Sequence, residues 1–91
     1  MTIGRVIGNV VSTIKHDVFV GRKLLLVQPL DLARRPSGQV IVAVDSVGAG
    51  AGEEVIVVTE GRAAAEILHV SNSPVRAVVA GVIDEVKLAR D

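Results

Sequence analysis

Short runs of β-branched and aliphatic residues recur along the whole chain, and glycine, proline or polar residues separate them. Such runs are typical of β-strands, because branched side chains pack well on a pleated surface. One alanine-rich stretch, residues 61–70, is instead typical of a short helix. We expect five strands, at residues 2–14, 23–30, 40–47, 53–60 and 75–89. The fold class is therefore mainly β, and five strands with one short helix between strands four and five favour a small OB-like β-barrel.

Glycines interrupt the first and the last of these strands. Gly4 and Gly8 lie within the first strand, where glycine marks a β-bulge, a bend or a close approach of another backbone. Gly81 lies within the last strand, and we expect a bend there. The segment 31–39 holds a proline and a glycine, so it is interpreted as a loop whose arginines are solvated.

The aliphatic content exceeds what one small core can bury. Val, Ile and Leu make up 33 of the 91 residues, and 19 of these are valine. A chain of this length forms a single domain, residues 1–91, which buries only about 60–65% of the surface that its unfolded form exposes. Soluble monomers avoid large exposed apolar patches, and the ten basic residues balance the ten acidic ones, so copies of the chain repel one another little. We therefore expect the chain to associate with itself.

Several classes of function are disfavoured by what the sequence lacks. Cysteine is absent, which excludes disulfides and sulfur-ligated metals, and His16 and His69 lie far apart in the sequence without a carboxylate at a familiar ligand spacing. We expect no metal and no cofactor. With zero net charge, no Trp or Tyr and only Phe19, the chain offers neither a positive groove nor stacking platforms for nucleic acid. No apolar run is long enough for a transmembrane helix, and the first residues do not resemble a signal peptide, so no membrane partner is expected.

Three alternating glycines, Gly48, Gly50 and Gly52, are the most distinctive local motif. A phosphate-binding fingerprint needs its glycines to open a helix, whereas these lead into Glu53 and Glu54 and then into a strand. Carboxylates at that point would repel phosphate. We interpret the motif as a wide or bulged turn in which one backbone packs closely against another.

The polar residues do not form a recognisable catalytic set. Ser12 and Thr13 precede Lys15 and His16, but neighbouring residues of a strand point to opposite faces, so adjacency in sequence does not make a triad. The acidic residues are interpreted as solvated charges at turns and strand ends: Glu53, Glu54, Asp84 and Glu85. We expect no enzymatic activity, and a small enzyme is the least favoured class.

Three blocks of the chain together resemble the signature of a known family. They are "VVSTIKHDVFVGRKLLLVQPLD" (10–31), "VAVDSVGAGAGEEVIVV" (42–58) and "SPVRAVVAGVIDEV" (73–86). In this order they resemble the EutN/CcmL family, the pentameric vertex proteins of bacterial microcompartments, which include carboxysomes. The segment "GRAAA" (61–65) departs from the family's Gly-Ser-Ala-Ala-Arg, which puts in doubt any contact made by the missing serine and arginine.

The resemblance implies a structural shell protein whose homopentamers close the five-fold corners of a shell in the bacterial cytoplasm, beside hexameric shell proteins. The alternative is an OB-like binding module for a small ligand, an oligosaccharide or single-stranded nucleic acid. For the vertex protein we expect a pore at the five-fold axis lined by the glycine motif and by two hydroxyl residues: Gly48, Ala49, Gly50, Ala51, Gly52, Ser12 and Thr13. A hairpin loop far from the axis is the alternative for that motif. Subunit contacts are expected to use the first and last strands, with Arg76 and Asp84 as partners of an ion pair between subunits.

Overall fold

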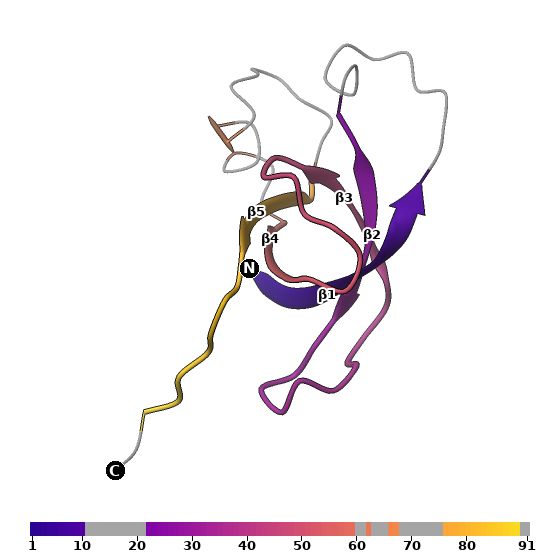
Figure 1. Ribbon diagram of the computed structural model, residues 1–91. Coiled ribbons are helices and arrows are strands. Elements are labelled where there is room, and N and C mark those ends of the chain that lie inside the picture. Colours follow the sequence, from indigo (N-terminus) through magenta and orange to yellow (C-terminus); the bar gives the residue numbers. More distant parts are fainter. Residues whose placement is uncertain (11–21, 60–61, 63–65, 68–75, 90–91) are drawn as a thin grey trace.

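Five strands close into a small barrel in the computed structural model of the protein (Figure 1). The structure describes residues 1–10, 22–59, 62, 66–67 and 76–89. The strands are β1 (Thr2–Val10), β2 (Leu24–Pro29), β3 (Ile41–Asp45), β4 (Glu54–Val58) and β5 (Val78–Val82). They follow one another around the barrel in the order β1-β2-β3-β5-β4, and β4 pairs with β1 to close it. All pairs are antiparallel except β3 with β5, which is parallel. The expected OB-like β-barrel is confirmed.

Each predicted strand is present, but the last one is much shorter than predicted. β5 ends at Val82, whereas the prediction extended to residue 89. The reason is the lack of a neighbouring backbone. Val82 pairs with Val55, and the N–H of Ile83 donates to the carbonyl of Glu54 at 2.8 Å. Before Glu54 the chain turns toward β1, so none of the described strands continues beside residues 84–89.

The other predicted boundaries differ less. The first strand is observed as far as Val10, and residues 11–14 lie outside the described part of the chain. Of the predicted helix at 61–70, the described residues Arg62, Glu66 and Ile67 are helical. The part of the chain that the structure describes thus contains almost no helix.

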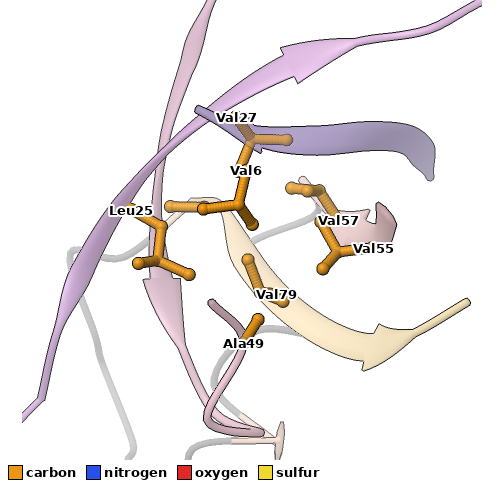
Figure 2. Packing of buried hydrophobic residues seen from close by; sticks show 8 residues of the cluster. Val6, Leu25, Val27, Ala49, Val55, Val57 and Val79 are labelled. Carbon is orange, nitrogen blue, oxygen red and sulfur yellow. The ribbon is translucent and has the colours of Figure 1, made fainter. Parts of the chain in front are cut away.

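Valine is the main residue of the core, with five of the eight residues in the buried cluster. Along β2, Leu25 and Val27 are fully buried while their neighbours are partly exposed, and β4 shows the same alternation. Within the chain, only the face of β2 toward the barrel interior is fully covered. Figure 2 shows the side chains of this cluster meeting inside the barrel, and they come from all five strands and from the loop after β3. The cluster consists of Val6, Leu25, Val27, Ala43, Ala49, Val55, Val57 and Val79.

The glycines in β1 have the two roles that the sequence indicated. A Cβ atom added to Gly4 would lie 2.9 Å from the carbonyl oxygen of Gln28, so only glycine allows β1 and β2 to approach this closely. The register between β1 and β2 shifts between Val6 and Gly8, which is a β-bulge. A second shift opposite Ile56 and Val57 places an irregularity beside Gly81, where a bend was expected.

Candidate functional site

A buried aspartate organises the loop that follows β3. Asp45 is 9% exposed, and its Oδ1 atom accepts hydrogen bonds from the backbone N–H groups of Val47, Gly48 and Ala49 at 3.0, 3.1 and 3.3 Å. Three donors that would otherwise lack a partner are thereby satisfied at once. The carboxylate thus fixes the path of the chain into the glycine motif.

Two of the three glycines in the motif are required by backbone conformation. Gly48 and Gly52 have φ angles of 78° and 88°, in the left-handed region that favours glycine. Apart from the adjacent residues, no atom of the described part of the chain lies within 4 Å of a Cβ added at either position. Within one chain, therefore, glycine is required at these two positions by the backbone conformation and not by a close approach of another backbone.

Gly50 differs from its two neighbours in the motif. A Cβ at Gly50 would meet only the Oε1 atom of Glu53, at an ordinary contact distance of 3.5 Å. The same Oε1 atom accepts the N–H of Gly50 at 2.6 Å, and the N–H of Glu53 donates to the carbonyl of Gly50 at 3.1 Å. Nothing described within this chain requires glycine at position 50.

The loop lies across one end of the barrel and is anchored to β1. The N–H of Gly52 donates to the carbonyl of Val6 at 2.8 Å, and the N–H of Val6 donates to the carbonyl of Glu53 at 2.9 Å. The side chain of Ala49 is fully buried in the core cluster (Figure 2). Of the residues predicted to line a pore, Ala49 can therefore contribute its backbone but not its side chain. Ala51 is exposed.

A cluster of two arginines and one glutamate joins three parts of the barrel. Glu54, at the start of β4, contacts the guanidinium of Arg34 in the β2–β3 loop, and one of its carboxylate oxygens lies 3.6 Å from Arg5 on β1. The Glu54 side chain is only 14% exposed. The expectations that Glu54 and Arg34 are simply solvated are wrong, because the closure of the barrel brings together residues that are 20 positions apart.

The β2–β3 loop is shaped so that Arg34 reaches Glu54. Arg34 has a φ angle of 65°, which is unusual for a residue other than glycine. Asp31 supports this conformation, because its carboxylate accepts the N–H groups of Ala33 and Arg35 at 2.8 and 3.0 Å. Its backbone carbonyl also accepts the N–H of Arg34 at 3.0 Å. Sequence reasoning missed this cluster, and no local motif signals it.

The remaining predicted site residues are distributed as follows. Arg76 and Asp84 are exposed and lie beyond the two ends of β5, which places both at the surface. Ser12, Thr13, His16 and His69 lie outside the described residues. Within the part of the chain that the structure describes, no group of three or more His, Cys, Asp or Glu side chains could hold a metal ion. None of the described residues belongs to a helix that is long and apolar enough to cross a membrane.

Aliphatic side chains remain exposed on the outside of the barrel. Ile7 on β1 and Val42 on β3 are each 52% exposed, and partly exposed Leu26 on β2 pairs with both Gly8 and Val42. An open groove of about 600 Å³ lies between the start of β1, the end of β2 and the β2–β3 loop. Its rim includes Met1 and Leu32, and its lining consists of Met1, Thr2, Ile3, Pro29, Leu30, Asp31, Leu32, Ser37 and Ile41.

The protein is thus a small closed β-barrel with an ordered glycine loop over one end and several aliphatic side chains exposed on its outer surface. Residues 1–84 match the family model described as "Ethanolamine utilisation protein EutN/carboxysome". The chain therefore belongs to the EutN/CcmL family, which confirms the resemblance seen in the sequence.

Individual relatives agree with the family match over nearly the full chain. The carboxysome shell vertex protein CcmL of Gloeobacter violaceus is 47% identical over 88 residues, covering 97% of this chain and 87% of the relative. The bacterial microcompartment shell vertex protein EutN of Salmonella typhimurium is 41% identical over 86 residues, covering 94% and 86%. Among solved structures, the GrpN pentameric microcompartment shell protein from Rhodospirillum rubrum superposes with a TM-score of 0.83 at 41% identity, covering 99% of this chain and 100% of GrpN.

Proposed function

We propose that this chain is a structural shell protein whose homopentamers cap the five-fold vertices of a bacterial microcompartment in the bacterial cytoplasm. The observation that carries the proposal is the likeness to GrpN, a pentameric shell protein, over the whole length of both chains. The relatives named as shell vertex proteins support it independently. Hexameric shell proteins are the partners that such a vertex requires, because flat sheets of six-fold tiles need five-fold corners to close.

The outer surface of the barrel supports self-association. A cyclic ring uses heterologous contacts, in which two different patches of each subunit are complementary. The exposed aliphatic side chains of Ile7 and Val42, with Leu26 between them, form one apolar patch across three neighbouring strands. With zero net charge, five copies can meet without a large electrostatic penalty.

A structural rather than a catalytic role is supported by how the ordered carboxylates are used. Asp45 holds the glycine loop, Asp31 shapes the β2–β3 loop and Glu54 joins two arginines. Each carboxylate is engaged in the chain's own architecture. The protein requires no cofactor for this role.

The glycine motif, Gly48 to Gly52, is the segment that we place at the five-fold axis, together with Ser12 and Thr13. Support comes from Gly50, because nothing described in its own chain excludes a side chain there. A neighbouring subunit would supply the missing reason for glycine. Arg76 and Asp84, exposed beyond the two ends of β5, are the proposed ion-pair partners between subunits.

Gly50→Val tests this placement. We expect the variant to fold, as judged by far-ultraviolet circular dichroism, but to lose the pentamer in native mass spectrometry. Gly81→Ala is the control, since a Cβ at Gly81 meets no atom of the described residues within 4 Å, and it should assemble normally. If Gly50→Val assembles as well as the parent chain, the glycine motif is not crowded at the axis.

Assembly of shells tests the function itself. Hexameric shell proteins produced together with this chain should form closed polyhedra in electron micrographs, and without it they should form open tubes or sheets. Closed shells that form equally well without the chain would contradict the proposal. Saturable binding of a single-stranded oligonucleotide or an oligosaccharide by a monomeric chain would favour the alternative binding module.

A further inference from the structure

We propose that residues 84–89 form a C-terminal arm that docks in the apolar groove of the neighbouring subunit. The proposal rests on the homopentamer proposed above and names one of its contacts. The occupant of the groove, which is lined by Met1, Ile3, Leu30, Leu32 and Ile41, is thus the arm of a second copy. Figure 1 shows the chain leaving the barrel after β5 and running away from it in an extended path.

The arm has the alternating pattern of a strand with one covered face. Glu85 and Lys87 are 69% and 81% exposed, and their charged atoms lie 4.0 Å apart, which places both side chains on one face of the extended arm. Val86 and Leu88 alternate with them and so belong to the opposite face. Leu88 is 61% exposed within its own chain. Val86 is already partly buried within its own chain, so the pattern predicts a partner surface chiefly for Leu88.

The length of the arm fits a contact between neighbours. The last backbone hydrogen bond that the described residues make on this side joins Ile83 to Glu54, so the arm is free from residue 84. Six extended residues span about 20 Å. The two shorter dimensions of the molecule are 24 and 21 Å, so the arm reaches about one barrel width from its anchor. It can cross an interface to an adjacent barrel.

The charges of the arm and of the groove's surroundings are complementary. Asp84 and Glu85 against Lys87 leave residues 84–89 with one net negative charge. The β2–β3 loop, which forms one wall of the groove, carries Asp31, Arg34 and Arg35, so its net charge is +1. The nearby charges of Arg5 and Glu54 cancel each other. The apolar face of the arm therefore meets an apolar groove, and the net charges attract.

Cross-linking tests where the arm docks, because the chain has no cysteine of its own. A variant carrying both Leu32→Cys and Leu88→Cys is treated with a short bismaleimide and separated on a denaturing gel. We expect a ladder of covalent chains that ends at five. Leu32→Cys or Leu88→Cys alone should give no band above a linked pair.

The control pair combines Leu88→Cys with Lys23→Cys, which places a thiol at the exposed residue before β2, at the opposite end of that strand from the groove. It should give no ladder. A ladder from this pair in place of the first, or a first pair that links only within one chain, would overturn the proposed docking site. The number of rungs reports separately on the proposed function, because a ladder that ends at two would leave arm docking intact and contradict the pentamer.

A second experiment measures what the arm contributes to assembly. Val86→Ser combined with Leu88→Ser should raise the concentration at which the pentamer dissociates by about tenfold or more. The reason is that two aliphatic side chains, which the groove would bury, are replaced by small polar ones. Glu85→Gln combined with Lys87→Gln alters the opposite face and should change that concentration by less than about threefold. Circular dichroism should show an intact barrel in both. Equal dissociation concentrations in the serine variant and the parent would contradict a docked arm, whereas a parent chain that never forms pentamers would instead contradict the proposed function.

Discussion

Replacement of Asp45 by alanine is the mutation whose cost can be worked out most directly from the structure. The carboxylate of this buried residue accepts three backbone N–H groups, the longest at 3.3 Å. A hydrogen bond contributes about 1 kcal/mol net, and a buried donor left without a partner costs as much or more. Asp45→Ala should therefore lower the free energy of unfolding by about 3 kcal/mol, which is a large part of the roughly 5–14 kcal/mol expected for a chain of this length.

The loss is measured by urea unfolding followed by far-ultraviolet circular dichroism, because the chain has no tryptophan or tyrosine to report by fluorescence. All chains are compared at one concentration, since association adds apparent stability. Asp45→Asn, which keeps an acceptor oxygen, should lose less than alanine. Ser46→Ala removes a single bond, from Oγ to the carbonyl of Val79 at 2.6 Å, and should cost about 1 kcal/mol. If Asp45→Ala unfolds within about 0.5 kcal/mol of the parent, the carboxylate does not hold the loop as described.

Two further substitutions probe β1 and the cluster around Glu54. Gly4→Ala should destabilise the barrel by about 1–3 kcal/mol in thermal unfolding, because the added Cβ would lie 2.9 Å from the carbonyl oxygen of Gln28. Gly8→Ala, whose Cβ meets its nearest atom at 3.8 Å, should cost less, and equal costs would refute the close approach. Glu54→Gln should cost about 1 kcal/mol, because Arg34 is more than a third exposed and solvent screens the pair. Added salt should reduce the difference between Glu54→Gln and the parent, and a difference that does not depend on salt would contradict an ionic role.

The strands could be predicted from the sequence because their pattern is local. Each run of branched residues yielded a strand, since alternation along the chain is enough to bury one face, as Leu25 and Val27 do in β2. The end of the last strand could not be predicted in this way. Val86 and Leu88 continue the alternation, but a strand also needs a neighbouring backbone, and no local pattern shows where the neighbour ends.

The roles of the glycines could be predicted only in part. That Gly4 marks a close approach was among the expected possibilities, and the structure selects it. Gly48 and Gly52 serve positive φ angles, whereas Gly50 serves no described purpose within its own chain. These three roles look identical in a sequence. The ion cluster around Glu54 was missed for a related reason, because residues far apart in the chain meet only when the barrel closes.

The mass of the assembled particle tests the account most directly. Native mass spectrometry of the purified chain in dilute solution should show one dominant species at five times the chain mass of 9.5 kDa. Its dissociation on dilution should release folded or unfolded single chains without a stable intermediate ring. A well-ordered monomer, or a closed assembly of any other number of chains, would contradict the vertex account.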